Sequence, residues 1–390
     1  MRPRRGRSAG GVLAVAFGIA AGAAFIAATG IAVLAGAVAT TLVKRPTKRV
    51  QDVRIYGADL DAAQITIQAT PDTALRGTYG FWFSDDTGYA RLGEIVSRAP
   101  GTVTRRVLTV SFGDLARARA GRLSGWVFLG PGELGVPYQD VTVATPIGPA
   151  PAWLVPAAEK SGRWVIQVHG RAVLRQETLR SVEVFRAAGY QSLLVSYRND
   201  GEAPDSTDHR YGLGDTEWED VDAAMCYARE NGATSVVLMG WSMGGAIALQ
   251  AAMRSANRRA VAGIVLDSPV ITWADVLAYQ GAARRLPTAV IAGALAILGH
   301  PRGGVVTGQH APVDLARLDL VARSGELSVP VLVMHSDDDG YVPAAASREL
   351  AARRPDLVTY VPFAPARHTK LWNYDPDKWN GAIRSWLAKL

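Results

Sequence analysis

The sequence predicts an α/β fold: a mostly parallel eight-stranded sheet with helices on both faces, preceded by a transmembrane helix and a small β-rich region. Three observations lead to this prediction. An uncharged apolar run lies near the N-terminus, a strand-rich segment follows it, and from about Tyr138 strand patterns alternate with helix patterns. Such alternation is typical of a parallel sheet covered on both faces. The 390 residues suffice for one large domain and an accessory region.

The apolar run predicts a membrane anchor over residues 12–43, behind a basic tail of residues 1–11. No charged residue occurs from Gly11 to Val43, and about 20 apolar residues are enough to cross a bilayer. Basic residues flank the run on both sides: Arg2, Arg4, Arg5 and Arg7 precede it, and Lys44, Arg45, Lys48 and Arg49 follow it. This placement suggests membrane lipid headgroups as partners, and no nucleic acid.

Two other interpretations of the run stay open. Ala37-Val38-Ala39 resembles the cleavage site of a secretory signal, although the apolar stretch of a signal usually has only about 7–15 residues. The run could also be a helix buried in a soluble protein. The positive-inside rule does not decide how the predicted span is oriented in the membrane, because similar numbers of basic residues lie on its two sides. We favour a membrane protein with one pass near the N-terminus, a cytoplasmic tail and an extracytoplasmic body.

Residues 44–137 form the predicted β-rich accessory region. The stretches "AQITIQAT", "GTYGFWFS" and "TRRVLTVSF" have strand character, and glycine and proline punctuate the segments between them. The region contains no histidine and no recognisable catalytic group. Its expected role is that of a spacer or packing platform between the membrane and the body.

Residues 138–390 contain the alternating pattern. The expected strands are 140–145, 152–155, 164–169, 192–197, 235–240, 261–267, 329–335 and 357–363, and the expected helices are 174–188, 216–231, 245–255, 344–352 and 376–387. A lid-like insertion at about 271–323 interrupts the alternation. Within it, the apolar segment Leu286–Gly299 is either a lid helix over a pocket or a helix packed into the core.

The motif Gly240-Trp241-Ser242-Met243-Gly244 matches G-x-S-x-G. In this motif the serine lies on a sharp turn between a strand and a helix, which exposes its hydroxyl above the sheet edge. An apolar strand precedes the motif and an alanine-rich helix pattern follows it. Ser242 is therefore the candidate nucleophile, and a serine that merely caps the helix is the alternative. The Met243 N–H, at the start of the helix, is one candidate donor to an oxyanion.

A serine nucleophile needs a base that is oriented by a carboxylate. Of the six histidines, His368 follows the last expected strand in a loop, where a base can reach the carboxyl ends of the strands. His169 and His335 end strands and are expected to be structural. Three aspartates, Asp337 to Asp339, directly follow another strand. The order serine, aspartate, histidine along the chain is the one expected of this architecture.

The motifs "VIQVHGR", "LLVSYRNDG", "GWSMGG", "HSDDDGYVP" and "ARHTKLWN" together resemble the α/β-hydrolase superfamily. The nearer likeness is to membrane-associated or secreted serine hydrolases and to prolyl-oligopeptidase-type peptidases. The resemblance implies the α/β-hydrolase fold, Asp339 as the acid with Asp337 as runner-up, and Arg171 as the second oxyanion donor. The Arg171 side chain is expected in solvent. Ser336, where a glycine is usual, leaves the substrate open.

The predicted function is that of a membrane-anchored serine hydrolase that cleaves an acyl ester or thioester through an acyl-enzyme. A serine peptidase is the second interpretation, and a non-catalytic membrane-tethered binding module is the third. The substrate is a small-molecule or peptide acyl compound. Neither a metal nor an organic cofactor is expected, because side chains, backbone N–H groups and water suffice for each step. The single cysteine, Cys226, excludes an internal disulfide.

Overall fold

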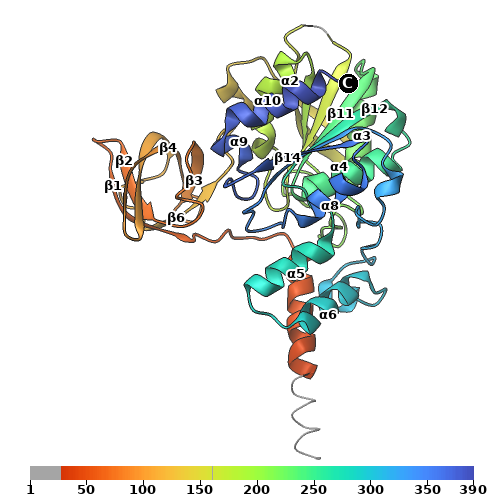
Figure 1. Cartoon of the computed structure of the whole chain (residues 1–390), viewed down its shortest axis with the longest axis horizontal. Helices are drawn as coiled ribbons and strands as arrows, with labels where there is room; N and C mark the ends of the chain where they lie inside the picture. The colour runs from red at the N-terminus through yellow and green to blue at the C-terminus, as the bar shows by residue number, and fades with distance from the viewer. Residues whose placement is uncertain (1–27, 160) are drawn as a thin grey trace, which may run out of the picture.

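The structure, a computed structural model, describes residues 28–159 and 161–390. Its described part contains a β-barrel, a larger α/β body and a helical cap that surrounds a helix near the N-terminus (Figure 1). The barrel lies to one side of the body, and the cap lies below the carboxyl ends of the strands of the body (Figure 1). The functional residues predicted from the sequence belong to the α/β body, at the edge of its sheet that faces the cap.

The body is built on an eight-stranded sheet with the order β14-β13-β12-β11-β9-β10-β8-β7. The strands are β7 (Gln139–Thr145), β8 (Gly148–Val155), β9 (Arg163–Val168), β10 (Gln191–Val195), β11 (Ser235–Trp241), β12 (Val261–Asp267), β13 (Val331–Ser336) and β14 (Val358–Phe363). The β7–β8 and β8–β10 pairs are antiparallel, and the other pairs are parallel. All eight expected strands are present, so the predicted sheet is confirmed.

Register brings the carboxyl ends of the central strands to one edge. Trp241 of β11 pairs with Asp267 of β12, which pairs with Met334 of β13. Residues that directly follow these strands therefore meet at the same edge, although they are far apart along the chain. The strands are apolar on both faces, as expected of a parallel sheet that is buried on both sides.

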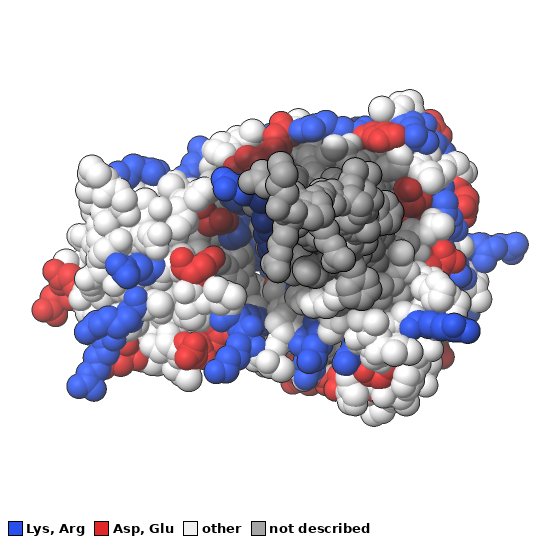
Figure 2. Space-filling model, turned by 90° about the horizontal axis from the view of Figure 1, so that it is seen from below, with Lys and Arg blue, Asp and Glu red and all other residues white. Residues whose placement is uncertain are grey.

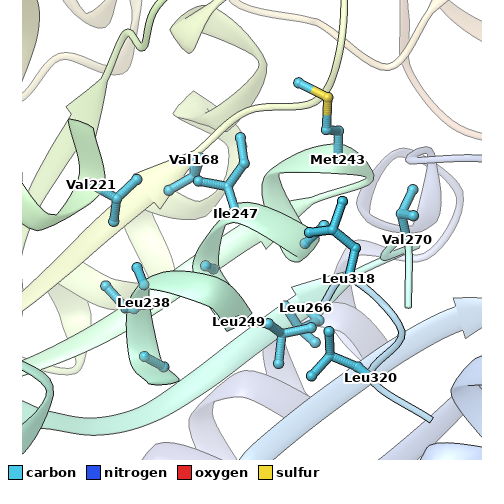
Figure 3. Packing of buried hydrophobic residues seen from close by; sticks show 14 of the residues in the cluster. Val168, Val221, Leu238, Met243, Ile247, Leu249, Leu266, Val270, Leu318 and Leu320 are labelled. Atoms are coloured by element: carbon cyan, nitrogen blue, oxygen red, sulfur yellow. The ribbon is translucent and has the colours of Figure 1, made fainter. Parts of the chain in front are cut away.

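Helices cover both faces of the sheet. One face carries α3 (Trp218–Glu230), α4 (Met243–Arg254) and α8 (Ala345–Arg353), and the other carries α2 (Val182–Ala187) and α10 (Pro376–Leu387) (Figure 1). Side chains of α4 pack against strand residues, as Ile247 lies beside Val168 in Figure 3. A buried leucine or isoleucine stabilises such a core by about 1.5–3 kcal/mol.

The accessory region is a closed six-stranded barrel with the order β1-β2-β5-β4-β3-β6. Its strands are β1 (Val53–Asp59), β2 (Gln64–Gln68), β3 (Tyr79–Phe83), β4 (Gly88–Ala99), β5 (Thr102–Phe112) and β6 (Ala120–Ser124). Arg105 of β5 is fully buried and donates to the carbonyls of Thr73, Leu75 and Gly77. Burial lowers the pKa of Arg105 to about 10. These bonds hold the loop between β2 and β3 in one conformation.

The cap comprises α5 (Trp273–Ala283), α6 (Thr288–Gly299) and α7 (Gly304–Thr307). It packs around the N-terminal helix (residues 28–43), which is drawn in red in Figure 1. A β-carbon on Gly293 of α6 would lie 2.9 Å from the β-carbon of Ala35, so the two helices are in close contact. The segment Leu286–Gly299 has features of both expected roles, because Ala294 and Leu298 belong to the main hydrophobic core, whereas Leu286 and Ile291 line a cavity.

The C-terminal part of the predicted membrane anchor, which was expected over residues 12–43, is packed against protein. Residues 12–27 of that prediction, and the tail of residues 1–11, lie outside the described residues. Ala35, Ala39 and Val43 are buried against the body and the cap, because their side chains recur on one face of the helix. Within residues 28–390, apart from 160, no helix combines the length and the apolar character needed to cross a membrane.

Candidate active site

Ser242 lies at the turn between β11 and α4, in a conformation that few residues adopt. Its φ is 51° and its ψ is −119°, and backbone of this kind is strained for a residue with a side chain. The Ser242 N–H donates to Asp267 O, and the Ser242 carbonyl accepts from the N–H groups of Gly245 and Val270. These bonds hold the turn and leave the hydroxyl partly exposed.

Glycines are required on both sides of the turn because the backbone passes too close for a side chain. A β-carbon on Gly244 would lie 2.2 Å from Val168 O, and one on Gly240 would lie 2.3 Å from Gly244 O. Neither backbone atom can move without shifting a central strand or the first turn of α4. The G-x-S-x-G pattern thus has the structural context that the sequence predicted for it.

Replacing Gly244 with alanine is expected to destabilise the fold by at least 3 kcal/mol, because the methyl group overlaps the backbone of β9. Gly381 in α10 is the matched control, since a β-carbon there meets no atom within 4 Å. Gly381→Ala should raise stability by about 0.5–1 kcal/mol through helix propensity. Denaturant unfolding of both variants measures the difference. If Gly244→Ala and Gly381→Ala changed the free energy of unfolding equally, the close approach of Gly244 to the backbone of β9 would not be required for folding.

The structure brings Ser242, His368 and Asp339 into one hydrogen-bonded chain. His368 Nε2 lies 2.9 Å from Ser242 Oγ, and His368 Nδ1 lies 2.7 Å from Asp339 Oδ2. Both distances are those of good hydrogen bonds. The three residues follow β11, β13 and β14, so three strand ends assemble the group. This is the arrangement of a nucleophile, its base and an orienting acid.

The three neighbouring aspartates have different surroundings. Asp337 is half-exposed and pairs with Arg348. Asp338 accepts from the N–H groups of Ala366 and Arg367, which fixes the loop just before His368. Asp339 is buried and faces His368. The sequence favoured Asp339 over Asp337, and the geometry places Asp339 against the histidine.

The Asp339 carboxylate is held in its charged form. Burial by itself would raise its pKa, but His368 and His335 lie against it and hold the pKa well below the usual range. Its other oxygen accepts from the N–H groups of Tyr341 and Val342. His335 in turn is buried and bonded to Ser347 and the Val342 carbonyl, as expected of a structural histidine.

The two predicted oxyanion donors lie on either side of Ser242. Met243 is the first residue of α4, and Arg171 lies in the loop that follows β9. A β-carbon on Gly170 would be 3.3 Å from the β-carbon of Ser242, so this loop passes directly over the serine. Among the described residues, neither the Met243 N–H nor the Arg171 N–H has a hydrogen-bond acceptor. Both are free to bind an oxyanion.

The Arg171 side chain differs from the expectation of a solvated arginine. Its guanidinium donates to the carbonyls of Thr41, Leu42 and Lys44, at the C-terminal end of the N-terminal helix. The last carbonyls of a helix have no partner within the helix and attract cations. Burial lowers the Arg171 pKa. Arg171 therefore ties the loop above Ser242 to the N-terminal helix, a link that sequence spacing could not reveal.

A buried network supports the same loop and was missed at the sequence level. His169 contacts Gly170 O through Nδ1 and Asp200 through Nε2, and it stacks on Tyr197. The Tyr197 hydroxyl also donates to Gly170 O. The only sequence signals were the neighbouring motifs "VHGR" and "YRND", each after a strand. These side chains hold the Gly170 carbonyl in place. The Arg171 N–H belongs to the same planar peptide group, so its direction is fixed as well.

The barrel contacts the loop that carries His368. Asp72, in the loop held by Arg105, pairs with Lys370 at 2.9 Å and lies 3.7 Å from Arg367. On the next turn, Asn373 donates to the carbonyls of Thr78 and Gly125. Burial raises the pKa of Asp72, but the nearby Lys370, Arg367 and His368 outweigh it and lower the pKa overall. The barrel is thus a support for the histidine loop.

Replacing Asp72 with asparagine is expected to lower kcat by about 2–5-fold with KM within twofold, because an interdomain ion pair of about 0.5–1 kcal/mol helps to position His368. Asp72→Glu should restore most of the rate. Arg76→Gln, which removes the exposed Arg76–Asp375 pair, is the control. Steady-state kinetics separates the constants, and an equal loss in both variants would refute a positioning role.

The same pair has a predicted pH dependence. The pKa of Asp72 is lower in the folded protein, so its contribution to stability is full above the unfolded pKa of about 3.9 and is lost as pH falls through the folded value. The difference in unfolding free energy between the wild type and Asp72→Asn should therefore shrink on acidification. Urea titrations at several pH values measure it.

A cavity of about 540 Å³ opens beside Ser242 and His368, within the usual range of about 300–1,000 Å³ for small-molecule sites. The N-terminal helix, α5 and α6 each contribute apolar side chains to its wall, including Val38, Val276 and Ile291. Trp241, which precedes Ser242 along the chain, does not line this cavity and is buried on the opposite face of the sheet.

Comparison with known proteins gave five results. Residues 165–382 match the model of the alpha/beta hydrolase family, and residues 54–124, the barrel, match a domain of unknown function (DUF8805). A Pyrococcus furiosus esterase, Pf2001, superposes with a TM-score of 0.52 at 18% identity, over 67% of this chain and 94% of the esterase. A Rhodococcus sp. ECU1013 esterase, RhEst1, has a TM-score of 0.45 at 20% identity, over 64% and 99%. Curated proteins gave no match.

Proposed function

Because the chain belongs to the alpha/beta hydrolase family, we propose that this hydrolase is a serine esterase that uses Ser242, His368 and Asp339. The observation that supports the proposal is the continuous hydrogen-bonded chain from Asp339 through His368 to Ser242, at the edge of an apolar cavity. A serine hydroxyl becomes nucleophilic when an oriented base can accept its proton.

The proposed reaction has two halves. Ser242 Oγ attacks the ester carbonyl while His368 Nε2 accepts the hydroxyl proton, and the Met243 and Arg171 N–H groups bind the oxyanion. The tetrahedral intermediate collapses, and His368 gives the proton to the leaving alcohol. Water then attacks the acyl-enzyme, with His368 again as the base, which releases the acid and restores Ser242. Asp339 keeps His368 in the required tautomer.

An ester is preferred to an amide because of the cavity wall. Most lining residues are apolar, and the polar side chains of the wall other than those of Ser242 and His368 are those of Thr41, Arg171, Gln280, Arg284 and Tyr341. A peptidase would need hydrogen-bonding partners for the backbone of its substrate, since buried peptide groups are costly when unpaired. The segments that line the cavity offer few such partners.

A panel of p-nitrophenyl acyl esters, acyl thioesters and aminoacyl p-nitroanilides tests the substrate class. We expect kcat/KM for the best ester to exceed that for the best anilide by at least 100-fold, with thioesters in between. Anilides cleaved faster than esters would favour the peptidase, which remains the alternative function.

We also propose that the chain is held at a membrane by residues 12–34. The uncharged run supports this, since residues 12–34 include the roughly 20 apolar residues that a span needs. Val33 and Leu34 on the N-terminal helix and Val305 and Val306 on the cap are exposed, and Val33 and Val306 line the same pocket. Figure 2 shows the molecule from below, on the side of the N-terminal helix. Basic and acidic side chains are mixed on this face.

The proposed topology places the tail of residues 1–11 in the cytoplasm and the body outside it. Arg45 lies 3.7 Å from Asp205, and Arg49 lies over the ring of Trp126, so these cations are engaged by the body. Protease accessibility in intact cells tests the topology. Digestion of the body only after permeabilisation would contradict it, and release of the chain by salt alone would contradict the span.

A further inference from the structure

We infer that the N-terminal helix is one wall of the acyl subsite, and that this subsite takes an apolar acyl chain of medium length. The inference rests on the proposed esterase function, because it assigns the acyl part of the ester to the cavity beside Ser242. It also gives the apolar segment near the N-terminus a role in specificity that is separate from anchoring.

One face of the N-terminal helix lines the cavity. Leu34, Ala37, Val38, Thr41 and Leu42 all contribute to the wall. Their spacing is i, i+3, i+4, i+7 and i+8, which is one continuous stripe along a helix. The cavity therefore runs along the helix axis rather than touching it at one point.

The opposite wall comes from the cap. Val276 and Leu277 of α5 and Ile291 of α6 face the cavity, with Leu286 between the two helices. Apolar side chains on both sides offer an acyl chain the free energy of apolar burial, about 0.8 kcal/mol for each CH₂ group. No carboxylate lines the described walls, and the amide of Gln280 already donates to a backbone carbonyl. The walls therefore favour an apolar acyl group over a polar one.

The N-terminal helix is fixed to the body at the end nearest to Ser242. Ala39 and Val43 are fully buried in the main core. The Arg171 guanidinium binds three carbonyls at this end, at distances of 2.7–2.8 Å. The residue proposed to bind the oxyanion through its N–H thus also holds the acyl wall through its side chain, which sets the wall at a fixed position relative to the serine.

The length of the wall predicts the length of the acyl chain. Leu34 and Leu42 are about 12 Å apart along the axis, at a rise of 1.5 Å for each residue. An extended backbone advances about 3.5 Å for every three bonds, so about ten bonds cover this distance. We therefore expect the best substrates to carry roughly eight to ten acyl carbons.

The test uses the full-length chain in detergent with p-nitrophenyl esters from acetate to palmitate. The wild type should have its highest kcat/KM at octanoate or decanoate. Val38→Trp fills the cavity from the wall and should lower the decanoate-to-acetate ratio of kcat/KM at least tenfold. Val33→Trp is the matched control on the same helix, because Val33 is 66% exposed and does not line this cavity. It should keep the wild-type ratio.

The decanoate-to-acetate ratio of kcat/KM does not depend on how much of each variant is folded and active. It therefore tests the acyl subsite separately from folding and from the proposed function. Fluorophosphonate labelling measures active serine in each preparation. A labelled wild type with a flat chain-length profile, or an equal fall of the ratio in both tryptophan variants, would overturn the inference and leave the esterase intact. A wild type that is folded but neither labelled nor active on any ester would overturn the proposed function itself.

Discussion

Replacing Ser242 with alanine is expected to lower kcat/KM for the best ester by about 10⁵–10⁶-fold, since the proposed mechanism has no other group that forms the acyl-enzyme. The fold should be unaffected, because the hydroxyl bonds only to His368 among the described residues. Oxyanion donors and substrate binding remain, so a small rate above that in water persists. Steady-state hydrolysis and thermal unfolding together measure the two quantities.

Ser97→Ala is the control for this experiment. Ser97 is an exposed serine on β4 of the barrel, and its replacement should leave kcat/KM within twofold. A Ser242→Ala protein that is folded and retains more than about 1% of the activity would mean that another nucleophile carries the reaction.

Replacing Asp339 with asparagine is the second large effect, with an expected loss of about 10⁴-fold in kcat. An amide NH₂ that faces His368 Nδ1 would make this nitrogen an acceptor. The proton would then lie on Nε2, which could no longer accept the proton of Ser242. The oxygen of the introduced amide could still accept the Tyr341 and Val342 N–H bonds that Asp339 accepts, so the loop should stay folded.

The effect on stability has a definite sign. The Asp339 pKa is lowered in the folded state, so the charged carboxylate stabilises the fold above its unfolded pKa of about 3.9, and this contribution is lost as pH falls through the folded value. Asp339→Asn should be less stable than the wild type at pH 7, and the gap should narrow on acidification.

Asp337→Asn is the matched control, because Asp337 is half-exposed and pairs with Arg348 on the surface. We expect less than a twofold change in kcat. If Asp337→Asn and Asp339→Asn lost activity equally, or if Asp337→Asn lost more, the assignment of the acid would be wrong. Hydrolysis of a single ester at pH 7 to 9 is sufficient to rank the two variants.

The sheet and the position of Ser242 were predictable because they depend on local patterns. Buried strands and amphipathic helices alternate along the chain, and G-x-S-x-G lies at one of the junctions. Parallel strands bring their carboxyl ends together, so residues after β11, β13 and β14 could be expected to meet. The choice of Asp339 among three aspartates relied on family resemblance, and the buried position of its carboxylate agrees with it.

Contacts between distant segments could not be predicted in this way. Hydropathy indicated that residues 28–43 are apolar, but lipid and protein interiors both select apolar residues. Only the fold reveals that Ala39 and Val43 enter the core and that Arg171 binds the end of this helix. Likewise, nothing in the sequence near Asp72 links the barrel to Lys370, almost 300 positions away.

The proposed esterase mechanism requires Ser242 to be an activated nucleophile. Incubation of the full-length chain with a fluorophosphonate, followed by peptide mass spectrometry, tests it most directly. We expect one adduct, on Ser242, with labelling abolished in Ser242→Ala and strongly slowed in His368→Ala. Labelling of a different serine, or no labelling of a folded chain, would contradict it.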